Sequence, residues 1–336
     1  MIKVLAHGNK ESGCTWHRIA LPLGFMPECT SFVTNFIGKE VLEKDQWQIF
    51  FYNRMSPFDN NWQKFKDETG MKVVMDIDDC WDLPPGHINY ESYRENKARI
   101  ETNIRCADLV TCTHSRLADK IRPLNENVQV MPNALPFGLN QYRDDREPDP
   151  EGYTRLFWAG GISHMNDIEI LRFPMQRIKT LPNIKAVIGG YSNLNQYTKD
   201  IWDRMVSSFT CGLQIQPLVL GSAAVNQYMD HFMNADIMLI PLEDQVWTSY
   251  KSNLKLLEAA SKRIPVVVSA VEPYLENEPP VIHVTKQSGW YNGVKALLDP
   301  ELRKQKGDEL YEWAVKNYSL QDVNVYRRAA FVKLIS

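Results

Sequence analysis

The sequence lacks the features that mark disulfide-rich, zinc-binding or membrane-spanning proteins. Its six cysteines are scattered, and no two of them form a CxxC pair. This spacing argues against a zinc ribbon and a disulfide scaffold, and it suits a reducing compartment. No apolar run approaches the roughly 20 residues that span a bilayer. The N-terminal run Met1–Ala6 also turns polar too soon for a signal-peptide core. We therefore expect a cytoplasmic protein with no transmembrane segment.

The sequence also has no strong overall charge, no repeat and no low-complexity tract. Its formal net charge of −3 creates no basic field, so it neither requires nor excludes a polyanionic partner. A hydrophobic content of 44% and a charged content of 24% are ordinary for a globular protein. A chain of 336 residues fits two domains of about 150 residues each.

Short apolar runs alternate with helical patterns along both halves of the chain. The runs that read as buried strands include Ile2–Ala6, Val73–Ile77, Arg155–Trp158, Ile184–Ile188 and Asp236–Ile240. Such alternation predicts parallel sheets with helices on both faces. The segment 136–152 is rich in Pro, Asp and Arg and lacks hydrophobic periodicity, which favours a linker. We predict an α/β protein with an N-terminal Rossmann-like domain at 1–135 and a C-terminal one at 153–317.

One stretch late in the chain has the properties of a phosphate site. A polar loop from Trp247 leads into a helical pattern that contains Lys255 and Glu258, and the apolar run Ile264–Ser269 follows. Ser252 or Asn253 is a natural N-cap, and a helix start beside lysines suits phosphate. Lys251, Lys255 and Glu258 are spaced i, i+4, i+7 and would share one helical face. The alternative is an ordinary solvated helix face.

Glycine-bearing loops follow two of the predicted strands. The first loop contains Gly8, Gly13 and Cys14, and the second contains Gly160 and Gly161 with His164 shortly after. Glycines at this position let backbone amides approach a ligand closely, with a helix N-terminus behind them. Neither loop is a GxGxxG motif, so an ordinary βα loop is the alternative.

Four aspartates cluster within seven residues at the end of the predicted strand Val73–Ile77: Asp76, Asp78, Asp79 and Asp82. Ligands of open α/β sheets bind at this edge. Neighbouring carboxylates repel one another, so each needs a cation, a hydrogen bond or solvent to stay charged. Carboxylate oxygens also suit magnesium or manganese, and a polar turn is the third interpretation. Aromatic and proline neighbours favour a functional site.

The C-terminal half resembles the glycosyltransferases of the GT-B fold, most of all the broad retaining family that includes many envelope-glycan and sucrose-pathway enzymes. The segments that carry the resemblance are Leu156–Gly161, Ile184–Gly190, Ala235–Pro241 and Lys255–Ser269, with Ala107–Ala118 ending the first domain. It implies two Rossmann-like domains facing across a cleft, and a C-terminal helix at 318–336 that crosses back to the first domain. That family usually carries two glutamates eight positions apart. Glu258 matches the second, but Tyr250 stands where the first would fall.

The resemblance implies a donor site for a nucleotide-diphosphate sugar, with a UDP-sugar as the first expectation. Glu258 would bind the nucleotide ribose, and Lys251 and Lys255 would replace the family's usual pair of cations on the diphosphate. The remaining donor-binding residues would be Ser252, Asn253, Gly160, Gly161, His164, Gly13 and Cys14. Asp78 or Asp79 would orient or deprotonate the acceptor hydroxyl, and Trp81, His87 and Tyr90 would contact the acceptor.

The expected activity is transfer of a hexosyl or pentosyl group to a hydroxyl, with retention of configuration and no required cofactor or metal. A non-catalytic binder of nucleotide sugars or carbohydrate is one alternative. A metal-dependent phosphotransferase built on Asp76, Asp78 and Asp79 is another. The acceptor stays open between a glycan or envelope component and a hydroxylated base in nucleic acid. The basic residues Arg94 to Arg105 favour the latter only weakly, because soluble helices often carry such charges.

Overall fold

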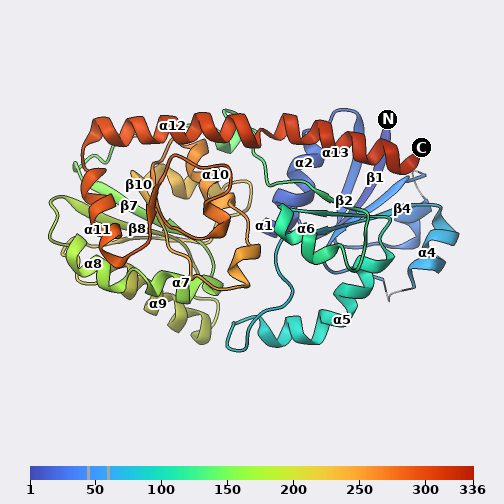
Figure 1. Ribbon diagram of the computed structural model, residues 1–336, viewed down its shortest axis with the longest axis horizontal. Coiled ribbons are helices and arrows are strands. Elements are labelled where there is room, and N and C mark those ends of the chain that lie inside the picture. Colours follow the sequence, from blue (N-terminus) through green and yellow to red (C-terminus); the bar gives the residue numbers. More distant parts are fainter. Residues whose placement is uncertain (44–45, 59–60) are drawn as a thin grey trace. The chain divides into compact units, whose positions relative to one another are not determined.

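A computed structural model describes residues 1–43, 46–58 and 61–336. The chain divides into two compact units. Unit 1 comprises Met1–Ala134, Tyr250–Ser252 and Tyr318–Ser336, and unit 2 comprises Leu135–Ser249 and Asn253–Asn317. Each unit contains a six-stranded sheet, and its paired strands run parallel (Figure 1). Within the described ranges, no helix has the length and apolar character needed to cross a bilayer.

Unit 1 has the strand order β2-β1-β3-β4-β5-β6. Its strands are β1 (Ile2–His7), β2 (Cys29–Thr34), β3 (Ile49–Asn53), β4 (Lys72–Ile77), β5 (Leu109–Cys112) and β6 (Val128–Val130). Its helices are α1 (Gly13–Thr15), the π-helix η1 (Trp16–Ala20), α2 (Leu21–Gly24), α3 (Lys39–Glu43), α4 (Trp62–Thr69), α5 (Tyr90–Cys106), α6 (Ser115–Ile121) and α13 (Leu320–Ile335).

The alternation of side chains along each strand explains why both faces of this sheet are covered. Successive strand residues point to opposite faces, so Phe50 and Phe51 enter different cores. Phe50 packs with residues of α4, α5 and α6, whereas Phe51 packs with η1, α2 and α13. The ring of Phe331 on α13 meets Phe51 edge-on at a centroid distance of 5.8 Å. The C-terminal helix is thus part of the core of unit 1.

Unit 2 has the strand order β12-β11-β10-β7-β8-β9. Its strands are β7 (Thr154–Ala159), β8 (Ile184–Tyr191), β9 (Leu218–Gly221), β10 (Ile237–Ile240), β11 (Val266–Ser269) and β12 (Ile282–Val284). Its helices are α7 (Met165–Glu169), α8 (Arg172–Ile178), α9 (Gln196–Thr210), α10 (Leu254–Ser261), α11 (Gln287–Ala296) and α12 (Pro300–Tyr318). Short 3₁₀ helices are η2 (Asn140–Tyr142), η3 (Ile162–His164), η4 (Tyr228–Asn234), η5 (Thr248–Tyr250) and η6 (Glu272–Tyr274).

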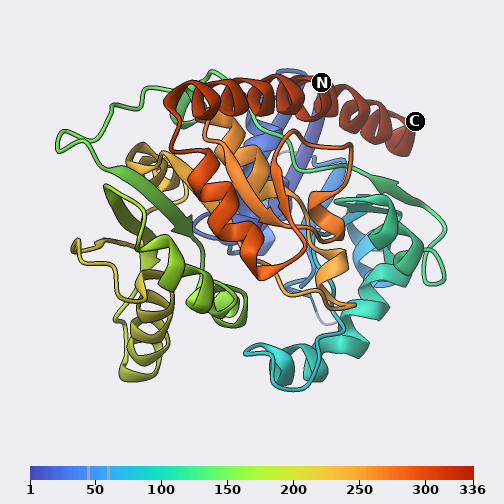
Figure 2. The ribbon, with the colours of Figure 1, turned by 60° about the vertical axis from the view of Figure 1, so that its left-hand side comes forward.

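The second sheet is also covered on both faces. One core joins Trp158 of β7 with Met175 of α8, Trp202 of α9 and Trp290 of α11. Figure 2 shows α8 and α9 side by side. On the opposite face, Phe157 meets Phe232 of η4 at a centroid distance of 4.8 Å. The predicted fold class, two Rossmann-like α/β units, is confirmed.

In each sheet there is one point from which successive strands are added first on one side and then on the other. In unit 1, β1 leads to β2 on one side and then to β3 on the other. In unit 2, β7 leads to β8 and β9 on one side, and β10 to β12 lie on the other. Open α/β sheets bind ligands beyond the carboxyl ends of the strands at such points. The loops after β1 and β3, and those after β7 and β10, are therefore the first places to examine.

The structure differs from the sequence expectations in two elements. The edge strand β2, a mixed polar and apolar segment, was not predicted. The segment 136–152, expected as a linker, packs within unit 2. Tyr142 is buried there, and Arg146 donates to the carbonyl of Ala235 at 2.8 Å.

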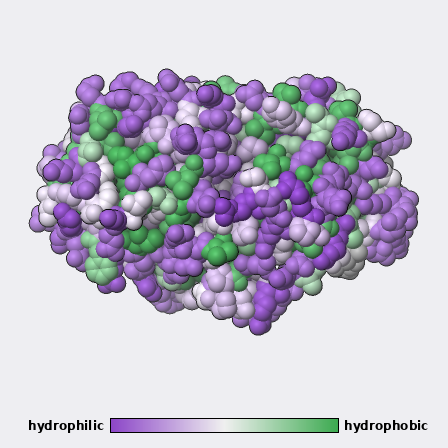
Figure 3. Space-filling view, viewed as in Figure 1, coloured by the Kyte–Doolittle hydropathy of each residue, from purple (hydrophilic) through white to green (hydrophobic). Residues whose placement is uncertain are grey.

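The face shown in Figure 3 mixes hydrophilic and hydrophobic residues. The hydrophobic residues form separate groups among hydrophilic ones. This face therefore presents no continuous apolar band, which is ordinary for a globular protein.

Candidate functional site

Asp76, the last-but-one residue of β4, is a structural anchor. Its carboxylate accepts hydrogen bonds from Arg18 at 2.8 and 3.0 Å, from Thr111 at 2.6 Å and from Asn53 at 3.0 Å. Asp76 is fully buried, and Arg18 is nearly so. A buried carboxylate that is paired and bonded in this way holds the ends of neighbouring strands together. Its oxygens are occupied, so the predicted phosphotransferase role of Asp76 has no support.

Asp78 lies one step beyond β4 and is paired with Arg54, which follows β3. Arg54 Nε lies 3.1 Å from Asp78 Oδ1, and Asn53 Nδ2 donates to the same oxygen at 3.0 Å. Burial acts to raise the pKa of Asp78, but Arg54 and hydrogen bonds from Cys14 and Asn53 outweigh it and lower the pKa. A carboxylate with a lowered pKa and engaged lone pairs is a poor proton acceptor. This geometry favours a positioning role for Asp78.

Asp79 is more open than its two neighbours. Its side chain is 31% exposed, and its Oδ2 lies 3.6 Å from Lys251 Nζ. The other oxygen accepts from the backbone N–H of Cys80 at 2.8 Å. Of Asp76, Asp78 and Asp79, Asp79 is therefore the best placed to meet a hydroxyl from solvent.

The segment Tyr250–Ser252 belongs to unit 1, although α10 begins two residues later in unit 2. The carbonyl of Tyr250 bonds to His114 Nε2 at 2.9 Å, and Lys120 Nζ lies 5.4 Å from the centre of the Tyr250 ring. Asn133 donates to Ser252 Oγ at 2.8 Å. We call this segment the 250–252 anchor. Its contacts give Tyr250 a structural role at the position where the resembling family has a glutamate.

The structure confirms one part of the predicted helix start and corrects another. Asn253, one of the two predicted N-caps, occupies the N-cap, although its side chain makes no capping hydrogen bond. Helix α10 runs from Leu254 to Ser261, so Lys251 precedes it and shares no helical face with Lys255 and Glu258. Ser252 accepts from Asn133, because the 250–252 anchor belongs to unit 1.

The predicted acceptor residues differ in accessibility. Trp81 is 3% exposed and packs in the core beneath α5, with Lys120 Nζ 5.0 Å from its ring centre. Its burial leaves no ring face for a ligand, so the expected acceptor contact is replaced by a core role. His87 is half-buried, and its Nδ1 accepts from the N–H of Asn89. Tyr90 begins α5 with Arg94 over its ring at 5.8 Å.

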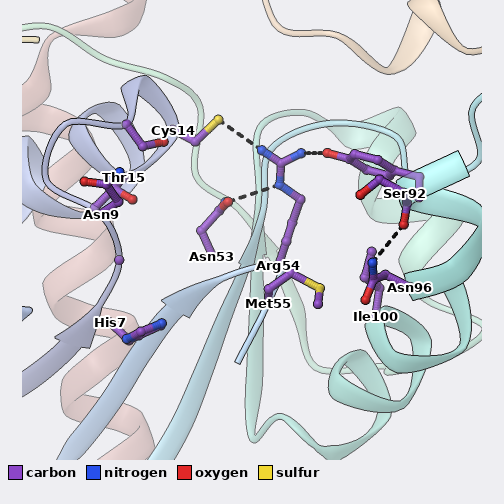
Figure 4. A pocket seen from close by; sticks show the side chains of 13 residues that line it. His7, Asn9, Cys14, Thr15, Asn53, Arg54, Met55, Ser92, Asn96 and Ile100 are labelled. Carbon is purple, nitrogen blue, oxygen red and sulfur yellow. Dashed lines mark hydrogen bonds between the residues drawn. The ribbon is translucent and has the colours of Figure 1, made fainter. Parts of the chain in front are cut away.

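A pocket lies beyond the carboxyl ends of β1 and β3 in unit 1. Its volume is about 320 Å³. It is lined by residues of the β1 loop, the β3 loop and α5: His7, Gly8, Asn9, Ser12, Cys14, Thr15, Asn53, Arg54, Met55, Ser92, Tyr93, Asn96 and Ile100. Figure 4 shows Arg54 in the middle of this pocket with Cys14 to one side. We refer to it as the β1/β3 pocket.

The loop glycines of unit 1 shape this pocket in different ways. A Cβ at Gly8 would come within 2.6 Å of Thr15 Oγ1, so only glycine lets the loop lie against α1. Gly13 begins α1 and has open space around its Cα. Burial, with Asp78 nearby, raises the pKa of the Cys14 thiol to about 12, and Arg54 Nη2 donates to its sulfur at 3.0 Å. Cys14 is therefore a neutral thiol at physiological pH.

In unit 2, Lys255 of α10 reaches the end of β7. Its Nζ donates to the carbonyl of Ala159 at 2.5 Å and lies 5.4 Å from the centre of the Trp158 ring. A Cβ at Gly160 would come within 2.9 Å of the Trp158 ring and 3.2 Å of Lys255 Nζ. Because Gly160 has no side chain, the ammonium group of Lys255 can lie close to the backbone at this position. Gly161 follows with open space around it.

His164 and Asp167 link the loop after β7 to the loop after β10. His164 Nδ1 lies 2.7 Å from Asp167 Oδ2, and Asp167 Oδ1 accepts from the N–H of Glu243 at 2.9 Å. Asp167 is 2% exposed. The carboxylate therefore holds two loops together at the switch point of unit 2 and orients the His164 ring.

Glu258 is buried one turn after Lys255. Burial raises its pKa to about 7, although Lys255 acts in the opposite direction. Tyr228 and Tyr274 are buried as well, and their own burial raises the pKa of each hydroxyl. The charge of Glu258 adds to both shifts. A carboxyl whose pKa is near 7 changes charge in response to what binds beside it.

Within the described residues, no group of three or more His, Cys, Asp or Glu side chains is arranged to hold a metal ion.

Sequence reasoning missed Arg54 and Asn53. A signal for both was present, because they directly follow the predicted strand ending at Tyr52, and strand ends of a parallel sheet gather at one edge. The sequence offers Tyr93 as an aromatic for a nucleic-acid acceptor, but its hydroxyl accepts from Arg54, a contact that only the tertiary fold creates.

Comparison with solved structures finds the same two-unit arrangement along nearly the whole chain. A sucrose-phosphate synthase from Thermosynechococcus elongatus matches with a TM-score of 0.70 and 11% identity, covering 99% of each chain. HepE from Anabaena, solved in complex with UDP-glucose, matches with a TM-score of 0.69 and 12% identity, covering 99% of this chain and 100% of that one. The chain has the GT-B fold.

A UDP-forming trehalose-phosphate synthase from Burkholderia xenovorans shares the GT-B fold at a TM-score of 0.64 and 11% identity, covering 87% of this chain and 75% of that one. No family model matches the sequence. The comparison with curated proteins finds no match either. The similarity to these proteins is therefore one of fold, and the chemistry depends on the residues at the site.

Proposed function

We propose that the protein is a glycosyltransferase that moves a sugar from a nucleoside-diphosphate sugar to an acceptor hydroxyl. The observation that carries this proposal is the arrangement at the switch point of unit 2. There, Gly160 leaves its backbone accessible to a ligand, Lys255 supplies a cation, and Glu258 supplies a buried carboxyl. HepE, which has the same fold, was solved with UDP-glucose, and this supports a UDP-sugar as the donor.

The leaving group of such a reaction is a nucleoside diphosphate, on which negative charge develops as the glycosidic bond breaks. Stabilising that charge is the main task of the protein. Lys255 supplies the cation, and the start of α10 supplies backbone N–H groups and a partial positive charge. We assign the diphosphate to Lys255, Asn253 and the Gly160–Gly161 amides, with His164 beside them.

Glu258 is assigned to the ribose of the donor. A diol donates two hydrogen bonds to a carboxylate, which favours the charged form and lowers the carboxyl pKa. Because burial holds the pKa of Glu258 at about 7 in the free protein, donor binding should release a proton near neutral pH.

Asp79 is assigned to the acceptor hydroxyl, and Asp78 to positioning Arg54. Asp79 is partly exposed and engaged by Lys251, whereas the carboxylate of Asp78 is enclosed by Arg54, Asn53 and Cys14. A group that accepts or orients a proton must be within reach of the substrate. Lys251, Ser252, Gly13 and Cys14 act on the unit 1 side, where they shape the surroundings of Asp79 and Arg54.

The test is a screen of nucleoside-diphosphate sugars by thermal shift and calorimetry, since a tight ligand raises the unfolding temperature by mass action. UDP-hexoses and UDP-pentoses should be compared with GDP- and ADP-sugars. At least one should bind and release its nucleoside diphosphate in the presence of a hydroxylated acceptor. Binding without release would favour the carbohydrate-binding alternative, and absence of any binding would exclude the donor site.

Retention of configuration and independence from metal belong to the same proposal. The coupling constant of the anomeric proton at the new glycosidic bond, measured by NMR, decides the first. Activity in the presence of a chelator decides the second, because the proposed diphosphate ligands are protein groups. A strict requirement for magnesium or manganese would contradict the assignment of Lys255.

A further inference from the structure

The β1/β3 pocket is formed by residues of unit 1, whereas the donor residues assigned above belong to unit 2. Its position beyond the carboxyl ends of two parallel strands, at a switch point, is where α/β sheets bind small molecules. Its volume of about 320 Å³ is at the lower end of the range for such sites. The pocket therefore suits one small group rather than a long polymer segment.

The lining of this pocket is rich in uncharged hydrogen-bonding groups. Amides come from Asn9 and Asn96, and hydroxyls from Ser12, Thr15 and Ser92. The amide of Asn53 also lines the pocket, but it is already bonded to Asp76, Asp78 and Arg54. Amide and hydroxyl groups both donate and accept, which matches the dual capacity of a sugar hydroxyl. Met55 and Ile100 add apolar surface that can pack against C–H groups.

Arg54 carries the one permanent cation among the lining residues, and its charge is already neutralised. Its Nε is paired with Asp78 at 3.1 Å, its Nη2 donates to Cys14, and its Nη1 donates to the Tyr93 hydroxyl. The guanidinium donors are thus directed to protein partners. An incoming phosphate would have to compete with the Asp78 carboxylate, a like charge, for the same cation.

The other titratable groups of the lining are neutral near pH 7. Burial raises the pKa of Cys14 to about 12 and that of Tyr93 to about 12. Burial lowers the pKa of His7, although a hydrogen bond with the backbone of Thr34 acts the other way. Asp78 and Arg54 cancel, so the pocket as a whole offers no net charge to a ligand.

We infer that the β1/β3 pocket binds an uncharged, polyhydroxylated ring of the acceptor, a carbohydrate unit without phosphate or carboxylate. The role as acceptor site rests on the proposed function, whereas the preference for a neutral sugar rests on the pocket alone. Arg54 is a positioning residue in this site: it holds Asp78, Cys14 and Tyr93 in place.

The test is saturation-transfer NMR on the full chain with UDP present at saturating concentration. The probes are methyl glucoside, methyl galactoside, methyl mannoside, glucose 6-phosphate and the nucleoside of 5-hydroxymethylcytosine. At least one neutral glycoside should bind, and glucose 6-phosphate should bind about tenfold more weakly or not at all, because its charge finds no free cation.

A matched pair of variants locates the binding. Asn96→Lys places a cation in the pocket and should shift the preference toward glucose 6-phosphate by about tenfold or more. Ala98→Lys adds the same charge at an exposed position of α5 outside the pocket and should leave the preference unchanged. Asn96→Ala should weaken the glycoside without changing the affinity for UDP.

Four outcomes would overturn the inference. Two concern the unaltered protein and charged or nucleoside probes: equal or tighter binding of glucose 6-phosphate, and binding of the hydroxymethylated nucleoside in preference to every glycoside. The other two are an equal response of the two lysine variants and the absence of binding by all the neutral glycosides. Calorimetry with UDP-sugars on the same samples tests the proposed function independently, because a donor can fail to bind while the pocket still selects neutral sugars.

Discussion

At the carboxyl edge of the first sheet, Asp76, Asp78 and Asp79 each face a cation of unit 1: Arg18, Arg54 and Lys251 respectively. At the corresponding edge of the second sheet, Lys255 bonds to a backbone carbonyl and lies over an indole ring, and the buried Glu258 has a pKa of about 7. At the first edge, each of these carboxylates lies beside a cationic side chain of the protein itself. At the second edge, a lysine lies beside a backbone carbonyl and an indole ring, and burial raises the pKa of the nearby carboxyl.

This contrast matches two different tasks. An edge with cancelled charges can recognise an uncharged group by hydrogen bonds without attracting anions. An edge where a lysine lies beside exposed backbone and a helix start is suited to a diphosphate. Four single substitutions test this difference between the two edges.

The largest effect is expected from Asp79→Asn at the first edge. If Asp79 orients or accepts the proton of the acceptor, its loss should lower the turnover rate about 10²- to 10⁴-fold while donor affinity stays the same. Steady-state rates and donor calorimetry measure both. Asp78→Asn is the companion variant, and it should also lower stability by roughly 3–5 kcal/mol because it leaves Arg54 buried without its ion-pair partner. Full activity of Asp79→Asn would remove Asp79 from the mechanism.

Lys255→Ala should weaken binding of the UDP-sugar by about 10- to 100-fold, because a charge-assisted bond to phosphate contributes roughly 1.5–3 kcal/mol. Calorimetry with UDP measures the loss directly. Lys295→Ala is the matched control, since Lys295 is exposed near the end of α11 in the same unit. Equal affinities of the two variants would show that the second edge does not bind the diphosphate.

Glu258→Gln tests the titratable carboxyl through stability and pH. The folded-state pKa is raised from 4.5 to about 7, so the neutral form is favoured by folding. Its stabilising contribution is present below pH 4.5 and is lost as the pH rises to about 7. The ligand-free variant should therefore exceed the original protein in stability by up to ~3 kcal/mol at pH 8. Denaturant unfolding at pH 4.5 and pH 8 checks this.

The same variant should lose donor affinity, because the amide of Gln cannot accept both hydroxyls of a ribose. In the original protein, donor affinity should rise as the pH increases through 7, since binding favours the carboxylate. Affinity that is independent of pH between 6 and 8 would separate Glu258 from the donor.

Ser252→Ala should have the smallest effect, about 1 kcal/mol, since it removes one hydrogen bond from Asn133. Hydrogen exchange at the amides of 250–254 should become faster. Ser222→Ala, at an exposed position of unit 2, should leave those amides unchanged. An unchanged exchange rate in Ser252→Ala would show that the 250–252 anchor depends on the Tyr250 and Lys251 contacts alone.

The strand pattern of both halves was predictable because buried strands of parallel sheets read as apolar runs. Val73–Ile77 and Asp236–Ile240 are examples. Strand β2 was not predicted because it lies at the edge of its sheet, where none of its six residues is fully buried and polar residues interrupt the apolar ones. The N-cap of α10 is Asn253, one of the two residues predicted for it, but Lys251 was wrongly placed on the helix because tertiary contacts hold Tyr250–Ser252 in unit 1.

The sequence alone determined the fold class, the aspartate cluster at a strand end and the helix that carries Lys255 and Glu258, since each depends on periodicity and spacing between near neighbours. The tertiary structure alone decided which charged and polar side chains meet one another. Arg18 reaches Asp76 across 58 positions, and Asn133 reaches Ser252 across 119. Pairings over such distances follow from which strand ends meet at one edge of a sheet, and this depends on the whole strand order rather than on any local segment.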